Sequence, residues 1–166
     1  MHLTNEHQIF SYHLGQVVEN LQSLEATLRI VLSEGHGPDP FKLQAGQQVP
    51  ETVMTTWASL SELIRKFNKI VSCEYHLDED SIVSLRDALV HGFTLIKHSD
   101  SPTRLIKFGK PMNGMVPVEI AVDMTSEWLA EQRKTTFEAF GRIVAYTKDH
   151  PGLIEIGPAV PDAPPS

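Results

Sequence analysis

The chain has 166 residues, of which 41% are hydrophobic and 21% charged, a composition that fits one soluble domain with a sizeable core. Its formal net charge of −7 argues against a general nucleic-acid binder, because such proteins neutralise phosphates with basic side chains. No apolar run approaches the roughly 20 residues of a membrane span, and the single cysteine, Cys73, excludes an intrachain disulfide and a cysteine-based zinc site. The N-terminus lacks a secretory pattern, so a cytoplasmic location is expected.

The first part of the chain predicts two long helices separated by a loop. Apolar residues recur at three- and four-residue steps over 6–33, which is the period of an amphipathic helix. Glycine, proline and glutamine dominate residues 35–50 and predict a loop. A second helix is predicted over 51–74, because Pro50 suits a first helical turn. Its expected apolar stripe consists of Trp57, Leu60, Leu63, Ile64, Phe67, Ile70 and Val71.

A third helix is predicted to begin near residue 79, because the sequence LDED at 77–80 supplies carboxylates that can cap it. Gly92 is expected to end this helix in a left-handed conformation, which glycine adopts without steric penalty. The expected buried face consists of Ile82, Leu85, Ala88 and Leu89.

Short β-branched or alternating runs flank an Asn-Gly pair and predict a two-stranded β-hairpin at about 103–123. Thr125 or Ser126 is expected to cap a fourth helix that extends to about residue 149. Its expected inward face consists of Trp128, Leu129, Phe137, Phe140, Ile143 and Val144. The predicted fold is mainly α: a four-helix bundle over residues 1–150 with the hairpin inserted before the last helix. Residues 151–166 hold five of the eleven prolines and are expected to form an extended tail.

The stretch RDALVHG at 86–92 places a cation, an anion and an imidazole at the end of the third helix. Asp87 and His91 are four residues apart and share a helical face, so the carboxylate is expected to hold one ring nitrogen. Arg86 lies about 140° from His91 around the helix, so a site that uses both groups is expected to be completed by a second copy. Residues 61–110 hold eight of the fourteen Lys and Arg, which predicts that any anion-binding surface uses this part of the chain.

RDALVHG on an apolar helix, in a small helical chain, resembles the motif of the HEPN superfamily (higher eukaryotes and prokaryotes nucleotide-binding). That motif is an arginine, often followed directly by a polar residue, and then a histidine after four to six residues. Arg86, Asp87 and His91 match these three places, and the resemblance covers about residues 6–149. It implies a helical bundle that forms a homodimer with both motifs in one cleft. Many members are metal-independent endoribonucleases of toxin–antitoxin, abortive-infection and CRISPR systems, so neither a cofactor nor a metal is expected.

The resemblance implies a catalytic role for each motif residue. His91 would act as general base or acid on the RNA 2′-hydroxyl or the leaving oxygen. Arg86 would stabilise charge on the phosphoryl oxygens, and Asp87 would orient His91. The sequence departs from the family at Asp87, since asparagine is commoner there in active members and an acid near the scissile phosphate is unfavourable. The implied partners are RNA and either an antitoxin or another protein, and no association with a membrane is expected.

Two other functions stay open. Some HEPN members are inactive or bind protein partners, so the chain could be a non-catalytic interaction module that uses a bundle face or the hairpin. The three motif residues could also satisfy one another at a helix junction of a structural helical protein. The remaining groups are predicted to have no catalytic role. His2, His7 and His13 lack the spacing of a metal site and are expected to be solvated or at an interface. LDED at 77–80 is expected to start a helix, and Trp57 and Trp128 are expected to anchor the core or an interface.

Overall fold

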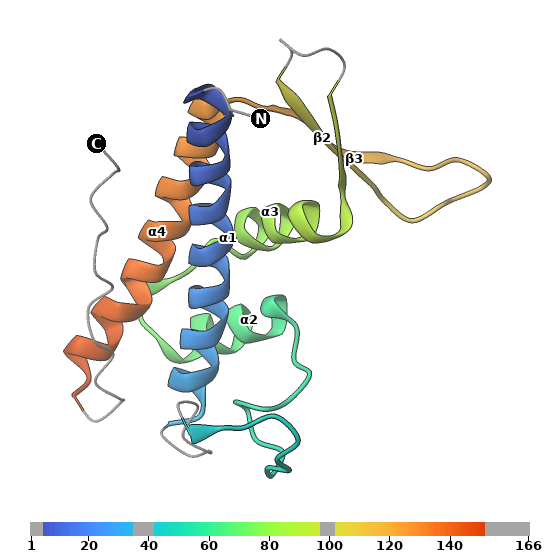
Figure 1. The fold of residues 1–166 in the computed structure, drawn as a ribbon. Helices are drawn as coiled ribbons and strands as arrows, with labels where there is room; N and C mark the ends of the chain where they lie inside the picture. The colour runs from blue at the N-terminus through green and yellow to red at the C-terminus, as the bar shows by residue number, and fades with distance from the viewer. Residues whose placement is uncertain (1–4, 35–41, 97–101, 152–166) are drawn as a thin grey trace.

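A computed structural model gives the fold and describes residues 5–34, 42–96 and 102–151. The described residues form four α-helices and a small three-stranded antiparallel sheet, so the mainly helical class is confirmed. Two long helices lie side by side, and the two short helices cross them instead of running parallel (Figure 1). The predicted stop of the first helix at 35–40 and the proline-rich tail beyond Pro151 lie outside the described residues.

The two long helices are α1 (Asn5–Leu32) and α4 (Ser126–Asp149), and both confirm the periodicity of the sequence. Thr125 caps α4 by accepting a hydrogen bond from the backbone N–H of Trp128. The two helices make the most extensive helix–helix contact of the fold. Their contact includes a polar link, because the Asn20 side chain donates to the Thr136 hydroxyl over 3.1 Å.

The inward face of α4 differs in part from the predicted one. Phe137 was expected to be buried, yet it is 59% exposed. The face instead passes through the buried small residues Thr136 and Ala139 and continues to Ile143. Small side chains at the contact let the two long helices approach closely along their length. The pattern of large apolar residues in the sequence does not show where such small residues form the contact.

The helix α2 (Leu60–Ile70) is much shorter than the predicted helix over 51–74. It begins at a capping box, in which the Ser59 hydroxyl accepts from the N–H of Glu62 and the Glu62 carboxylate accepts from the N–H of Ser59. The preceding residues are held in an irregular conformation by α1, since Arg29 donates to the carbonyl oxygens of Thr56 and Ala58. Trp57 is therefore fully exposed and belongs to no helical stripe.

The helix α3 (Glu79–His91) follows a 3₁₀ turn, η2 (Cys73–Tyr75), and confirms the predicted third helix. Asp78 caps it by accepting a hydrogen bond from the N–H of Ser81. The buried residues are Ile82, Leu85 and Ala88, as predicted, whereas Leu89, which was also expected on this face, is only partly buried.

Gly92 ends α3, but the predicted left-handed conformation is wrong, because its φ is −77°. Glycine is required there for space. A Cβ atom at residue 92 would collide with the carbonyl oxygen of Ala88 and lie 2.9 Å from that of Ile106. The absence of a side chain therefore lets the end of α3 lie against the sheet.

The sheet contains β1 (Phe93–Leu95), β2 (Thr103–Phe108) and β3 (Val118–Met124) in that order. The predicted hairpin is confirmed as β2 and β3, with Asn113 and Gly114 at positive φ in its turn. The strand β1 was not predicted, because three residues are too few for a recognisable alternation. It pairs with β2 directly after α3, so the sheet is anchored to the end of that helix.

The apolar core has two parts. The larger part joins the four helices. The smaller part lies between the sheet, α3 and α4, and is centred on Ala88, Leu105, Met124 and Leu129. One face of the sheet is therefore buried against the helices, and this contact fixes the position of the α3 C-terminus.

Candidate functional site

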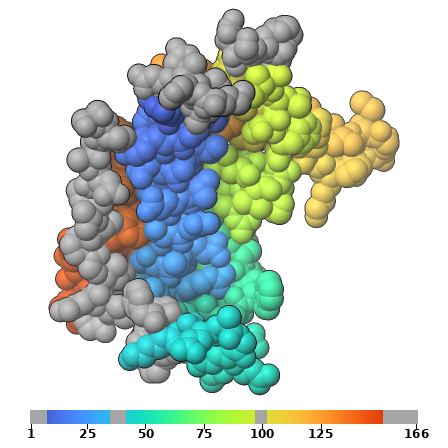
Figure 2. Space-filling view, viewed as in Figure 1, coloured from blue at the N-terminus to red at the C-terminus, as the bar shows by residue number. Residues whose placement is uncertain are grey.

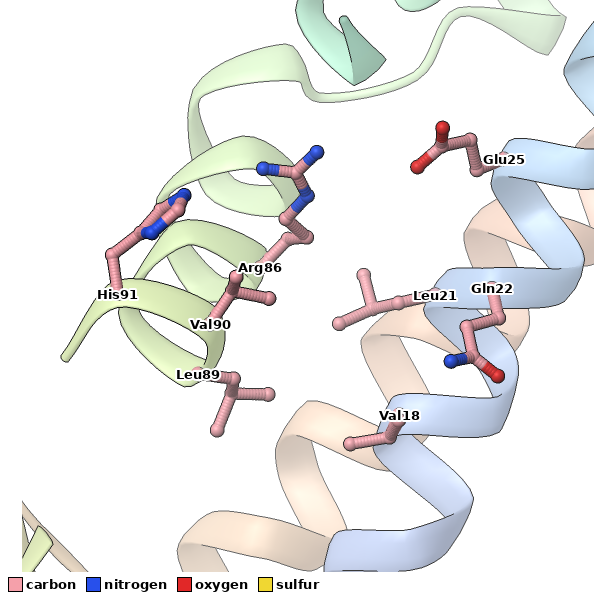
Figure 3. A pocket seen from close by; sticks show the side chains of 8 residues that line it. All are labelled: Val18, Leu21, Gln22, Glu25, Arg86, Leu89, Val90 and His91. Atoms are coloured by element: carbon pink, nitrogen blue, oxygen red, sulfur yellow. The ribbon is translucent and has the colours of Figure 1, made fainter. Parts of the chain in front are cut away.

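An open pocket of about 380 Å³ lies between α1 and α3 (Figure 3). Both walls come from helices that the sequence predicts well. The α1 wall consists of Val18, Leu21, Gln22 and Glu25, and the α3 wall of Arg86, Leu89, Val90 and His91.

Arg86 and His91, two of the three predicted site residues, line this same pocket. The sequence predicts that a site using both groups is completed by a second copy, because the two residues diverge around the helix. In the structure both residues line the pocket of one chain, with Arg86 on the side of α3 that faces α1 and His91 projecting from the other side (Figure 3). The contribution of a second copy stays a prediction. His91 is the last residue of α3, where its ring is exposed.

The pocket has a polar end and an apolar end. Arg86 and His91 extend toward one end, and Glu25 faces them from α1 (Figure 3). Val18 and Leu89 line the opposite end. A ligand that combines an anionic group with an apolar or aromatic body would match this division, because each part would meet a wall of similar polarity.

Asp87, the third predicted residue, is not in the pocket lining. Its carboxylate forms an ion pair of 2.8 Å with Arg86, and both side chains are about 30% exposed. Within the described part of the chain no side-chain hydrogen bond joins Asp87 to His91, so the predicted orienting contact is not formed. The flexible, permanently charged guanidinium of the adjacent residue takes the carboxylate in place of the imidazole.

Glu25 is the residue that sequence reasoning missed. Its carboxylate forms a 2.8 Å ion pair with Arg29, one turn further along α1. Arg29 is itself fixed by the carbonyl oxygens of Thr56 and Ala58. Val18, Leu21, Gln22 and Glu25 follow helical spacing, but nothing in the sequence shows that this face of α1 meets α3.

Half of the cations in the predicted anion-binding region are paired with carboxylates. Four of the eight cations in 61–110 form ion pairs with carboxylates, and Lys97 lies outside the described residues. The pairs are Arg65–Glu79, Arg86–Asp87, Arg104–Asp123 and Lys107–Glu119. A broad attraction for phosphates is therefore weakened, and binding of an anion depends on local geometry in the pocket.

Shifts in pKa mark structural contacts away from the pocket. Hydrogen bonds from Arg65 and Ser61 lower the pKa of Glu79, which joins α3 to α2. A hydrogen bond to Asp149 raises the pKa of Tyr75 to about 12. These groups connect elements of the fold, and none of them lines the pocket between α1 and α3.

Histidines near the N-terminus give no sign of a metal site. His2 and the side chain of His7 lie outside what the structure describes. His13 is partly buried, and its Nδ1 atom has no hydrogen-bond partner. Burial and, to a smaller extent, Arg133 lower the pKa of His13, which favours the neutral ring. Among the described residues no group of three His, Cys, Asp or Glu side chains is arranged to hold a metal ion.

No protein-family model, curated protein or solved structure matches the chain. The resemblance to HEPN proteins therefore rests on RDALVHG and its helical setting. No described helix is long and apolar enough to cross a membrane.

Proposed function

We propose that the chain is a metal-independent endoribonuclease that binds the RNA backbone in the pocket between α1 and α3. One observation carries the proposal: Arg86 and His91 reach the same end of one open pocket. The side chain of His91 also forms no hydrogen bond within the described residues, so its ring nitrogens are available to a ligand.

The proposed reaction is transesterification within the RNA chain. The 2′-oxygen loses its proton, attacks the neighbouring phosphorus, and the bond to the 5′-oxygen breaks. The products are a 2′,3′-cyclic phosphate and a 5′-hydroxyl. His91 accepts the 2′-proton or supplies the proton to the leaving oxygen, and water serves the other transfer. Arg86 stabilises the charge that develops on the phosphoryl oxygens, after exchanging Asp87 for the phosphate.

The size and polarity of the pocket support a nucleotide as ligand. Its volume of about 380 Å³ falls within the range of roughly 300–1,000 Å³ for small-molecule sites. The polar end would hold the phosphate, and the apolar walls would contact ribose and base. The Gln22 amide can donate and accept hydrogen bonds at the edge of the base.

The test is cleavage of mixed RNA by the purified chain in excess chelator. Replacing His91 or Arg86 with alanine should reduce the rate, and for His91 by about 10²–10⁴-fold, the usual contribution of acid–base catalysis. His76→Ala and Lys134→Ala are matched controls, since both residues are exposed and line no part of the pocket. Far-UV circular dichroism checks that each variant is folded. Wild-type protein that leaves RNA intact would retire the nuclease proposal.

The toxin or defence role belongs to the same proposal. Expression of the wild-type chain in bacteria should arrest growth, and His91→Ala should remove this toxicity. A wild-type chain that cleaves RNA in vitro without affecting growth would separate nuclease activity from a toxin role.

A non-catalytic interaction module is the second candidate. It is favoured by the charges around the pocket, because Asp87 already neutralises Arg86 and Glu25 adds a carboxylate to the lining. Both acids oppose the binding of phosphate. The interaction module would be favoured by two results together: RNA stays intact in the cleavage assay, and NMR titration detects no binding of a mononucleotide in the pocket.

A further inference from the structure

The sheet has one covered face and one open face. Leu105 and Met124 lie on the covered face and are almost fully buried. On the other face the strand register brings Phe93 beside Ile106, and Phe108 beside Val118. Because paired residues of neighbouring strands point to the same side of a sheet, these side chains form one surface. We call it the outer face, and it consists of Phe93, Leu95, Ile106, Phe108, Val118 and Ala121.

The outer face exposes adjoining apolar side chains. Phe93 and Phe108 are 45% and 46% exposed, and their ring centroids are 5.6 Å apart. Leu95 and Val118 are also more than half exposed. Monomeric proteins rarely leave adjoining aromatic and aliphatic side chains uncovered on a regular surface, so this pattern is typical of an interaction site.

The charges beside the outer face cancel within the sheet. Arg104 and Asp123 stand opposite each other on the same face and form a 2.8 Å ion pair. The chain as a whole has a charge of −7, whereas this face has neither a surplus of cations nor one of anions. A strongly charged partner such as RNA would find no complementary potential here, and two identical chains can approach through this face without strong repulsion.

We propose that a second copy of the chain covers the outer face, so that two sheets pack face to face around a two-fold axis. A two-fold interface must be self-complementary, and a neutral apolar patch satisfies that condition. A stable interface covers about 800 Å² on each partner. The hairpin projects well beyond the helices (Figures 1 and 2), and its end adds Met112 and Met115, which are 70% and 75% exposed.

This dimer is independent of the proposed ribonuclease activity. No residue of the outer face lines the pocket between α1 and α3. It also differs from the dimer that the HEPN resemblance implies, in which two motifs share one cleft. Loss of the dimer and loss of RNA cleavage can therefore be measured separately.

The first test is sedimentation velocity of the full chain from micromolar to hundreds of micromolar concentration. The wild type should dimerise, and Phe108→Glu should raise the dissociation constant by about 30-fold or more, the effect of an interface hot spot. Phe137→Glu is the matched control, because Phe137 is similarly exposed but lies on α4. A monomeric wild type would overturn the proposal, as would a folded Phe108→Glu variant that still dimerises like the wild type.

A second test is needed in case Phe108→Glu fails to fold. Ala121 is small, exposed and on the outer face, so Ala121→Cys in a Cys73→Ser background reports directly on the surface. Its alkylation should slow as concentration rises through the dimerisation range. Gly141→Cys on α4, where the structure leaves open space, should react at a constant rate. Equal alkylation of Ala121→Cys in monomer and dimer would overturn the proposed interface.

Discussion

The two ends of α3 carry similar charged residues and use them differently. At the N-terminal end the Glu79 carboxylate accepts hydrogen bonds from Ser61 over 2.6 Å and from Arg65 over 3.0 Å, which ties α3 to α2. Toward the C-terminal end Arg86 forms an ion pair only with its neighbour Asp87 among the described residues. The side chain of His91 forms no hydrogen bond there. A charged side chain that bonds to a second helix stabilises the fold. A charged side chain that pairs only with its neighbour on the same helix can exchange that partner for a ligand.

The difference arises from the neighbours of each end. The N-terminus of α3 meets the polar side of a helix that supplies matching donors. The C-terminus lies between the sheet and an open pocket. Local geometry at this end is set by Gly92 and the buried contact with β2. The imidazole is thus held in place through the backbone, without a side-chain contact that a ligand would have to break.

Gly92→Ala should have the largest effect on stability at the C-terminal end. The new methyl group would collide with backbone oxygens of α3 and β2, so unfolding free energy should fall by about 1–3 kcal/mol. Urea denaturation measures this loss. Gly141→Ala is the control, since its Cβ would meet no atom within 4 Å, and it should stabilise the chain by about 0.5–1 kcal/mol. Two variants of equal stability would contradict the close approach of α3 to the sheet.

Asp78→Ala tests the N-terminal end of the same helix. Loss of the cap should reduce the unfolding free energy by about 1 kcal/mol, because the backbone N–H of Ser81 loses its acceptor. Asp80→Ala provides a comparison, since Asp80 is an exposed residue of the first turn that makes no capping bond. Thermal unfolding of the two variants should show the larger loss for Asp78→Ala. The reverse order would contradict the assignment of the cap.

The contact of Glu79 with Arg65 and Ser61 should appear in the pH dependence of stability. These partners lower the pKa of Glu79 in the folded chain below its ordinary value. The folded state therefore binds this proton less readily than the unfolded state does, so the stabilisation is complete above the unfolded pKa of about 4.3. It is lost as the pH falls through the lower, folded pKa. Urea titrations at successive pH values should give a flatter acid limb for Glu79→Gln than for the wild type.

Asp87→Asn should have the smallest effect on stability. A partly exposed ion pair contributes about 0–1 kcal/mol, so its loss should change the unfolding free energy by no more than that. The same change frees Arg86 to contact phosphate, and RNA cleavage should therefore rise. The measurement is the initial rate of RNA cleavage. Glu74→Gln is the control, because Glu74 is exposed and lies outside the pocket. A fall in rate would mean that Asp87 supports cleavage by positioning Arg86, and would contradict the expected competition between Asp87 and phosphate.

Local signals in the sequence predicted most of the secondary structure. Helical periodicity located α1, α3 and α4, capping residues located the starts of α3 and α4, and an Asn-Gly pair located the hairpin. These signals act over a few residues, so they can be recognised without knowing the fold. The second helix was predicted too long, because Arg29, 27 residues before Thr56, determines the conformation of the chain that precedes α2.

The sequence by itself determined that an arginine, an acid and a histidine stand at the end of one helix. Tertiary structure alone decided what surrounds them. Packing of α1 against α3 created the pocket and placed Glu25 opposite Arg86, and the pairing of Asp87 with Arg86 left His91 free of the predicted contact. The short strand β1 formed only because β2 supplied its hydrogen bonds. Each of these features depends on residues far apart in the chain, whose proximity results from burial of the common core and not from any local pattern.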